Sequence, residues 1–372
     1  MPAVVIDASA LTSVAAGSGI GTYVRNLLAA LAAAPGLNVA VSVLAEAAAA
    51  VAPGIERRPI HRRCKERARV EVVEHAVRLP WDDRMRRRSG EVFHEPGFHA
   101  PWGIRGPKVQ TLHDIIPLVL DEPDVAALRR RWHRFGPRYR GADAVIAVSR
   151  HTADEGIRVL GIDPDRIFVA HHGVDPIYRP GDAADRNAAP YLLVVGEYSR
   201  RKGFGEAFAV MDTLAEAGYP HTLKVVGRIH AHARDELETL RAAARQPERI
   251  ELLGHVADLA AEYRYAAALV MTTRYEGFGL PAVEAMASGT PVVAFANTAV
   301  SEVVSGGGIL VADGDVAAMV AALRRLLDSP AAADEIRQQG LARAAEFTWA
   351  KSAAVHAEVY EMVAAGLPTR RG

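Results

Sequence analysis

The chain has 372 residues, a formal net charge of +0 and 50% hydrophobic residues. This length is sufficient for two or three domains, each with a core of its own. The absence of net charge argues against a protein that coats nucleic acid over its whole surface, so we expect no nucleic-acid partner.

A single cysteine, Cys64, excludes an internal disulfide and a cysteine-based zinc site. The first residues, MPAVVIDASA, lack the basic region and the long apolar stretch of a signal peptide. Apolar runs elsewhere are short or interrupted by charge, so we expect no membrane span. The expected location is therefore the cytoplasm.

Short β-branched segments alternate with longer helical patterns, as in buried parallel strands joined by helices. In the first half the expected strands are 3–7, 38–44, 91–94, 108–112, 144–149 and 166–171. The expected helices lie near 22–34, 124–140 and 150–160. Residues 177–190, IYRPGDAADRNAAP, are rich in proline, alanine, aspartate and glycine, and this composition favours a linker.

The alternation restarts after this linker. The expected strands are 191–196, 222–227, 249–254, 268–273, 291–295 and 308–312, with helices between them and two or three more at the end. The pattern predicts an α/β protein with two doubly wound domains, 1–180 and 188–349, facing each other across a cleft. Ligands of such sheets bind beyond the carboxyl ends of the strands, so the cleft is the expected site.

Several common cofactor motifs are absent. Gly17-Ser-Gly19-Ile-Gly21 is followed by Thr22 and does not complete the dinucleotide fingerprint G-x-G-x-x-G. Neither a P-loop nor a G-x-S-x-G nucleophile elbow occurs. His94-Glu95-Pro96-Gly97-Phe98-His99 has the wrong spacing for H-E-x-x-H and contains helix breakers, so we interpret it as a loop and expect no metal site.

Phosphate binding remains as an interpretation. Gly19, Ile20 and Gly21 lie between a strand and a helix, where backbone N–H groups can bind an anion, although a plain tight turn explains them equally well. Arg201 and Lys202 follow a strand in VVGEYSRRKG, and two adjacent cations can neutralise a diphosphate without a metal ion. The simpler explanation is a solvated loop pair.

His113 ends the strand in KVQTLHDIIP, where it is either a functional residue or a satisfied core histidine. The segment TRYEGFGLPAVEAMASG follows another strand and begins a helix near Pro281. Its residues Phe278, Gly279 and Leu280 would present backbone N–H groups to a diphosphate. Carboxylates only accept hydrogen bonds, so Glu276 and Glu284 are expected to bind the hydroxyl groups at the two ends of a nucleotide sugar. Alternatively, Glu284 complements the helix dipole and Glu276 is solvated.

These segments together resemble the retaining glycosyltransferases of family four, which have the GT-B fold. The stretch from Glu276 to Glu284 is similar to the E-x7-E motif of that family. The resemblance continues in the same order through Gly19-Ile20-Gly21, LHDIIP (112–117), AVIAVSRHT (144–152), HHGVD (171–175) and VVG with Arg201-Lys202-Gly203. It implies that a final helix, about 350–368, crosses back to the first domain, which binds the acceptor, while the second binds the nucleotide sugar.

The resemblance implies a role for each candidate residue. Arg201 and Lys202 would bind the diphosphate, Glu284 the ribose, Glu276 the sugar hydroxyls and His113 the sugar with its phosphate. Backbone contacts would come from Gly19, Ile20, Gly21, Phe278, Gly279 and Leu280, and base contacts from the region of Val256. One departure is Glu197, which stands where many members have arginine or threonine, so one phosphate contact is expected to be missing or replaced.

The charges suggest a mechanism. Departure of a nucleoside diphosphate builds negative charge that Arg201, Lys202 and the helix N-terminus would stabilise. No Asp-x-Asp pair occurs in a suitable loop, so we expect metal independence and no cofactor beyond the donor substrate. The family retains anomeric configuration by same-face attack, and we assign no protein nucleophile.

Three other functions are compatible with parts of this pattern. A glycoside hydrolase would use Glu276 and Glu284 as acid and nucleophile, but it has no use for two cations beside a phosphate turn. A nucleotide-sugar epimerase would bind the same donor on a similar two-domain scaffold. The third alternative is a non-catalytic binding module. The full set of candidate site residues argues against it, because binding alone does not require them all.

The sequence carries less information on substrates. The motifs are most similar to those of bacterial mannosyltransferases of polysaccharide assembly, so GDP-mannose is our first choice of donor and a UDP-sugar the alternative. Residues 57–88 carry twelve Arg/Lys against five Asp/Glu, a balance of 12 − 5 = +7, and 128–140 carry six arginines. We expect a saccharide or lipid-linked acceptor and peripheral contact with an anionic membrane at its inner face. The alternative is a solvated arginine-rich surface.

Overall fold

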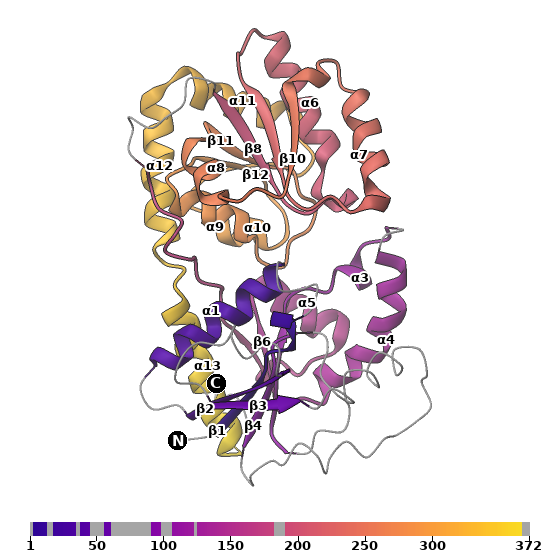
Figure 1. Ribbon diagram of the computed structural model, residues 1–372, viewed down its shortest axis with the longest axis vertical. Coiled ribbons are helices and arrows are strands. Elements are labelled where there is room, and N and C mark those ends of the chain that lie inside the picture. The colour runs from indigo at the N-terminus through magenta and orange to yellow at the C-terminus, as the bar shows by residue number, and fades with distance from the viewer. Residues whose placement is uncertain are drawn as a thin grey trace. The chain divides into compact units, whose positions relative to one another are not determined.

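The computed structural model describes residues 3–12, 18–34, 38–44, 56–60, 91–97, 106–122, 125–181 and 190–366. The chain forms two compact units. Unit 1 comprises residues 1–121, 125–173 and 349–372, and unit 2 comprises 122–124 and 174–348. The chain therefore returns to unit 1 after completing unit 2 (Figure 1).

Unit 1 is built on a seven-stranded parallel sheet with strand order β3-β2-β1-β4-β5-β6-β7. Its strands are β1 (Ala3–Asp7), β2 (Asn38–Leu44), β3 (Glu56–Ile60), β4 (Val92–Glu95), β5 (Lys108–Leu112), β6 (Ala144–Ala147) and β7 (Ile167–Val169). Order reverses at β1, which pairs with β2 on one side and β4 on the other. This reversal is the hallmark of a doubly wound sheet.

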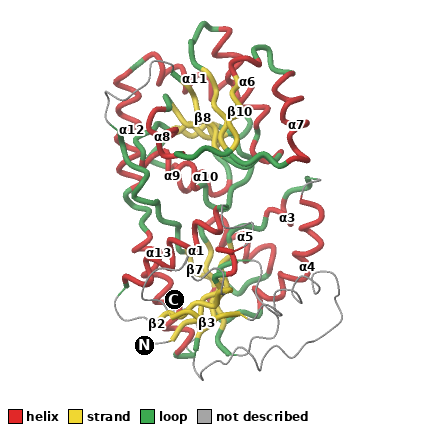
Figure 2. Tube along the Cα trace, in the orientation of Figure 1, coloured by secondary structure: helices red, strands yellow, loops and turns green. Residues whose placement is uncertain are grey.

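Helices cover both faces of this sheet (Figure 2). They are η1 (Ser9–Thr12), α1 (Gly19–Ala33), α3 (Ile116–Val119), α4 (Ala126–Arg140), α5 (Arg150–Leu160), η5 (Pro164–Arg166) and α13 (Trp349–Ala364). Successive residues of β6 enter different cores: Ile146 packs with α1 and α13, whereas Val145 packs with α4 and α5. Burial on both faces explains why the strand is apolar throughout.

Unit 2 has a six-stranded parallel sheet with strand order β10-β9-β8-β11-β12-β13. Its strands are β8 (Tyr191–Val195), β9 (Thr222–Val226), β10 (Ile250–Gly254), β11 (Ala268–Met271), β12 (Val292–Phe295) and β13 (Ile309–Val311). The order reverses at β8, between β9 and β11. Unit 2 is therefore also doubly wound.

The helices of unit 2 lie on both faces of its sheet (Figure 1). They are η7 (Arg200–Lys202), α6 (Phe204–Glu216), α7 (Ala231–Ala242), η8 (Pro247–Arg249), α8 (Leu259–Tyr265), α9 (Leu280–Ala287), α10 (Thr298–Val304), α11 (Val316–Asp328) and α12 (Pro330–Ala344). Phe208 of α6 and Leu323 of α11 are buried in one core with Val270 of β11. The fold class expected from the sequence is confirmed by these two parallel sheets.

Helix α13 belongs to unit 1 although it follows unit 2 in the chain. Trp349, Tyr360 and Val363 of α13 enter the core formed by α1 and the first strands. Tyr360 is fully buried there and is one of the largest side chains of the described chain to be so. The expected return of the final helix to the first domain is thus confirmed.

Some elements differ from expectation. Each of the twelve expected strands is present, with ends shifted by at most two residues, but β3 was missed. Helix α1 begins at Gly19 rather than near residue 22, so the glycine turn is already helical. Ile177 and Arg179, expected in the linker, accept hydrogen bonds from Arg264 of unit 2. The rest of the expected linker, 182–189, and most of the basic segment 57–88 lie outside the described residues.

The longest described helix, α13, has 16 residues. None of the helices in the described part of the chain is long and apolar enough to cross a membrane.

Candidate functional site

The cationic loop of unit 2 is held against the end of β11. It runs from β8 through η7 to Gly203, whose φ of 67° lies in the left-handed region, and then enters α6. A Cβ atom on Gly203 would lie 2.1 Å from the Thr272 carbonyl oxygen, a distance at which atoms overlap. Glycine is therefore required here on two counts, and its absence of a side chain brings Arg201 and Lys202 beside the segment after β11.

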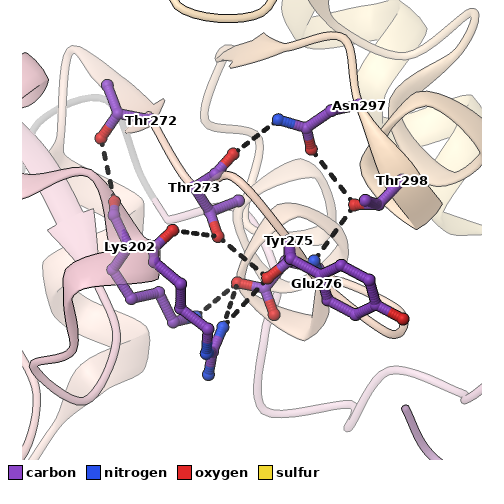
Figure 3. A network of polar contacts seen from close by, with 8 residues as sticks. Lys202, Thr272, Thr273, Tyr275, Glu276, Asn297 and Thr298 are labelled. Carbon is purple, nitrogen blue, oxygen red and sulfur yellow. Dashed lines mark hydrogen bonds and ion pairs between the residues drawn. The ribbon is translucent and has the colours of Figure 1, made fainter. Parts of the chain in front are cut away.

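Glu276 forms ion pairs with both cations of this loop (Figure 3). Its carboxylate is hydrogen-bonded to Lys202 Nζ and lies 3.7 Å from Arg201 Nη1. Arg201 also donates to the Tyr275 carbonyl at 3.0 Å. The Lys202 and Glu276 side chains are only 11% and 12% exposed, so water screens their attraction little. The structure thus brings together three of the candidate catalytic residues.

The protonation states of this cluster follow from burial and charge. Burial acts to raise the pKa of Glu276, but the charges of Lys202 and Arg201 outweigh it and hold the pKa below its usual value. Burial lowers the pKa of Lys202, helped by Arg201 and opposed by Glu276. Glu276 is therefore an anion near neutral pH, and as an anion it can accept hydrogen bonds from hydroxyl groups.

The glycine turn that follows begins α9. Gly279 is the N-cap with a φ of 101°, which favours glycine, and Pro281 lies in the first turn of the helix. The first amide that bonds within this turn is that of Ala282, to the Gly279 carbonyl at 3.0 Å. Phe278 is buried and packs edge-on against Phe347, with ring centroids 5.6 Å apart. These contacts fix the turn beside Glu276.

Glu284 lies one turn into α9 and has a different environment from Glu276. Its carboxylate accepts a hydrogen bond from Tyr263 at 2.9 Å. Burial raises the pKa of Glu284 to about 7, although hydrogen bonds from Tyr263 and Tyr178 act to lower it. The sequence offered no sign of these two tyrosines, because Tyr263 comes from α8 and Tyr178 from the loop after residue 173.

The Gly19-Ile20-Gly21 segment forms the first turn of α1 in unit 1. The helix's first intrahelical bond runs from the Thr22 amide to the Ser18 carbonyl at 3.0 Å. The amides of the three preceding residues come too early in the helix for an intrahelical acceptor. They keep the anion-binding capacity that was expected of a turn.

His113 follows β5 in unit 1 and is 7% exposed. Its Nε2 lies 2.7 Å from the Pro96 carbonyl oxygen, which can only accept, so Nε2 carries the proton. Its ring meets Tyr23 edge-on at 4.9 Å and stacks on His172 at 5.8 Å. Burial lowers the pKa of His113 to about 4, with the bond to Pro96 opposing, so the ring is neutral at pH 7.

Tyr23 also enters a chain of buried hydrogen bonds whose direction is fixed at one end. His356 Nδ1 lies 2.7 Å from the Ser352 carbonyl, so Nδ1 donates and the neutral ring accepts at Nε2. Tyr23 therefore donates its hydroxyl proton to His356 Nε2 at 2.8 Å. With that proton used, the Tyr23 oxygen accepts from Thr111 at 2.9 Å.

The same reasoning continues through the rest of the chain. Thr111 has donated its only hydroxyl proton, so it accepts from His94 Nε2 at 2.8 Å. His94 Nδ1 then accepts from Tyr360 at 2.7 Å. This chain, which we call the histidine chain, links β4, β5, α1 and α13 through neutral groups alone. Burial lowers the pKa of His94 well below its usual value and that of His356 to about 4.

The remaining candidates have ordinary environments. Val256 is half-buried in the loop after β10. Glu197 lies 2.5 Å from His230 on the surface. Within the described residues, no group of three or more His, Cys, Asp or Glu side chains could hold a metal ion. His94 and Glu95 of the rejected metalloprotease motif bind Thr111, Tyr360 and Gln110.

Three of the arginines in 128–140 have partners within the protein. Arg129 donates to Asp121 at 2.8 Å and to the Pro117 carbonyl at 2.9 Å. Arg138 lies over the ring of Phe135, and Arg140 donates to the Leu160 carbonyl. These side chains therefore stabilise α4 and its neighbours, whatever else they bind.

Two family models match the chain. One described as Glycosyltransferase Family 4 matches residues 17–177, and one described as Glycosyl transferases group 1 matches residues 189–329. The chain therefore belongs to the family-four glycosyltransferases, a retaining family of hexosyltransferases with the GT-B fold. The resemblance of its motifs to this family is confirmed.

Curated relatives carry several activities. A D-inositol 3-phosphate glycosyltransferase of Catenulispora acidiphila is 33% identical over 57% of this chain and 55% of the relative. O-antigen chain mannosyltransferase B of Escherichia coli is 28% identical over 74% of each chain. The chain thus spans little more than half of the first relative and about three quarters of the second.

Solved structures share the fold. Sucrose-phosphate synthase of Thermosynechococcus elongatus is 22% identical, with a TM-score of 0.76 over 98% of this chain and 100% of that one. HepE of Anabaena, solved in complex with UDP-glucose, is 17% identical, with a TM-score of 0.70 over the same shares of the two chains.

Proposed function

We propose that the protein is a retaining glycosyltransferase that moves a hexose from a nucleoside diphosphate sugar to a saccharide or lipid-linked acceptor. The proposal rests on the cluster of Arg201, Lys202 and Glu276 at the strand ends of unit 2, in a chain that belongs to this family. A pair of cations beside a hydroxyl-accepting carboxylate suits a ligand with a diphosphate next to a sugar.

The chemistry follows from these charges. The acceptor hydroxyl attacks the anomeric carbon as the bond to the diphosphate oxygen breaks, from the same face of the sugar. The acceptor's proton passes to the leaving diphosphate, so no protein base is needed. Lys202 and Arg201 stabilise the negative charge that develops on the leaving oxygen. When the diphosphate takes over these cations, Glu276 accepts hydrogen bonds from the sugar.

His113 contributes as a neutral group in this proposal. Its proton on Nε2 is donated to Pro96, so it adds no positive charge to the site. Because Nδ1 of the neutral ring can only accept, we propose that His113 accepts a hydrogen bond from a sugar hydroxyl, whereas a bond to the phosphate would require Nε2 to leave Pro96. Glu284, near the N-terminus of α9, binds the ribose in its ionised form.

The sugar is proposed to be mannose, from GDP-mannose. The support is the motif resemblance and the E. coli mannosyltransferase among the relatives. HepE, solved with UDP-glucose, keeps a UDP-sugar as the alternative. A thermal-shift screen over nucleotide sugars decides between them, because a ligand at 100 times its dissociation constant stabilises by ~2.7 kcal/mol.

An anionic or membrane-surface acceptor is proposed from the basic segments 57–88 and 128–140. Binding to vesicles with anionic lipids should be present at low salt and weaken as salt is added. Binding that ignores salt, or is absent at low salt, contradicts this part of the proposal.

The main test measures release of nucleoside diphosphate from nucleotide sugars in the presence of saccharide acceptors. Glu276→Ala should lower kcat, because sugar positioning near the breaking bond matters most in the transition state. Thermal unfolding without donor is the control, and the variant should melt close to the parent. Transfer by Glu276→Ala at the parent's rate contradicts the assigned role. Conversion of the donor sugar without diphosphate release would indicate the epimerase instead.

A further inference from the structure

The turn between β12 and α10 contains a strained residue. Thr298 has a φ of 39°, and it is the one non-glycine residue of the described chain with a positive φ. A β-branched side chain is particularly unfavourable in this region. Such strain persists only where neighbouring contacts hold it, and it is found most often at functional sites.

Asn297, which precedes Thr298, does not use its side chain as its position suggests. It is the N-cap of α10, where asparagine usually accepts a bond from an amide of the first turn, yet it makes no capping bond. Its Nδ2 instead donates to the Thr273 carbonyl at 2.8 Å and to Asp313 at 2.6 Å. Because both partners only accept, the orientation of the amide is determined, and Oδ1 faces Thr298.

Thr298 passes this arrangement on to Glu276. Its hydroxyl donates to Asn297 Oδ1 at 3.1 Å and accepts from the Glu276 amide at 3.1 Å. The Ala299 amide lies 3.4 Å from the Glu276 carbonyl. The segment Thr273–Glu276 is thus held at both of its ends by the turn 297–299 (Figure 3).

The cationic loop holds the same segment by other groups. The Arg274 amide donates to the Arg201 carbonyl at 2.7 Å, and Arg201 Nη1 donates to the Tyr275 carbonyl at 3.0 Å. The Glu276 carboxylate itself is held by its ion pairs with Lys202 and Arg201, with a weaker contribution from the Thr273 hydroxyl. A diphosphate that binds these cations competes for those ion pairs. The bonds from the turn 297–299 engage the backbone and survive that exchange.

We propose that Asn297 and Thr298 are positioning residues that hold the Glu276 carboxylate in place when the donor takes its cationic partners. This inference rests on the proposed function for its catalytic consequence. The placement of Glu276 is a structural claim that can be tested without activity. Thr298→Val removes the hydroxyl while keeping the shape and branching, and Thr298→Ser keeps the hydroxyl, so the two form a matched pair.

The kinetic arm compares these variants in two backgrounds. Thr298→Val should lower kcat about tenfold to a hundredfold, with donor KM within about threefold of the parent, whereas Thr298→Ser should stay within about threefold in both. In a Glu276→Gln background, Thr298→Val should add less than about a twofold loss, because residues that act through one another are non-additive. An unchanged kcat, or an undiminished loss in the Gln background, overturns the inference.

A rescue pair tests Asn297. Asn297→Asp places a carboxylate against Asp313 and the Thr273 carbonyl, and kcat should fall. Adding Asp313→Asn restores one donor between the two side chains and should recover part of that loss. No recovery, in a double variant that melts like the parent, contradicts the proposed role of Asn297.

The structural arm uses amide hydrogen exchange resolved at Glu276. The amide should be protected in the parent and in Thr298→Ser, and should exchange much faster in Thr298→Val. If the parent releases no nucleoside diphosphate from any nucleotide sugar, the proposed function fails and this arm alone decides the positioning claim. Rapid exchange at Glu276 in the parent overturns the claim in either case.

Discussion

In the part of unit 1 that the structure describes, four histidines are buried as neutral rings, whereas unit 2 buries a lysine and a glutamate as a charged pair. In unit 1, burial lowers the pKa of four rings, those of His94, His113, His172 and His356. In the hydrogen bonds described above, the ring nitrogens of His94, His113 and His356 pair with carbonyl or hydroxyl groups. In unit 2, Lys202 and Glu276 stabilise each other's charge beside Arg201. The two units bury polar groups by different physical means.

The difference predicts what each unit responds to. A chain of neutral hydrogen-bonded groups carries no charge that attracts an anion. It is sensitive to an added proton, because each group in it has a fixed role as donor or acceptor and a protonated ring nitrogen can no longer accept. In the charged cluster of Arg201, Lys202 and Glu276, the cations keep their protons near neutral pH, but they can exchange the Glu276 carboxylate for a charged ligand. Unit 1 is therefore expected to sense acid, and unit 2 to sense a diphosphate.

The largest expected effect is acid destabilisation of unit 1. Below the unfolded histidine pKa of about 6.5, the unfolded chain takes up protons that the folded unit refuses. Stability is therefore present above pH 6.5 and is lost as pH falls toward 4. At pH 5, His113 and His356 should each lower the free energy of unfolding by about 2 kcal/mol, or ~4 kcal/mol together.

The chain offers a selective probe for this measurement. All four tryptophans, at 81, 102, 132 and 349, belong to unit 1. Urea unfolding followed by tryptophan fluorescence should show a much lower midpoint at pH 5 than at pH 7.5. An equal midpoint at the two pH values contradicts the neutral state assigned to these histidines.

The next effect sharpens the charged side of the comparison. Lys202→Ala should lower kcat about a hundredfold to a thousandfold, because a preorganised donor to the leaving group is removed. Arg200→Ala is the matched control: this neighbour in η7 pairs with Glu236 at 2.8 Å, half-exposed, and its loss should change kcat by less than about threefold. Equal losses in the two variants would mean that general charge, rather than the buried cation, matters.

A smaller effect separates the two glutamates of the motif. Glu284→Gln should raise donor KM about tenfold to a hundredfold with kcat nearly unchanged, since a charged acceptor for the ribose is lost. Because the folded pKa of Glu284 is about 7, above its unfolded value, the ionised side chain destabilises unit 2 as pH rises from 4.5 to 7. The variant should therefore be more stable than the parent at pH 8, by about 3 kcal/mol at most.

Thermal or urea unfolding of both proteins at pH 4 and pH 8 checks the stability prediction for Glu284→Gln. The difference should vanish at pH 4, where the parent's carboxyl is protonated in both states. A variant that is less stable than the parent at pH 8 would contradict the raised pKa.

Much of the fold could be predicted from the sequence because its signals are local. Apolar runs such as ALVMTT become strands, and a serine at 149 begins α5 by accepting a bond from the Thr152 amide at 3.0 Å. Strand β3 was missed because its sequence, ERRPI, is charged and contains proline. It lies at the edge of the sheet, where such residues are tolerated.

Only those residues of the candidate site that lie within a single sequence motif could be predicted. Gly203, Lys202 and Glu276 each lie in a recognisable strand-to-helix segment. The partners that set their environment do not: Tyr23 and His356 are 333 positions apart, and Thr298 is 22 positions from Glu276. The neutral state of His113 and the raised pKa of Glu284 arise from this tertiary burial, for which the sequence carries no local signal.

The late position of α13 in the chain has a consequence for synthesis. Apart from residues 122–124, unit 2 is one continuous stretch, 174–348, whereas unit 1 lacks α13 until the ribosome has translated Trp349–Ala364. At ~5–20 residues per second, translation of the intervening stretch takes roughly 10 to 35 s. During that interval the nascent unit 1 has no His356 to accept the Tyr23 proton and no Tyr360 to fill its core. The unit that begins second is therefore complete first, and a translation pause before α13 would prolong exposure of the face of α1 on which α13 packs.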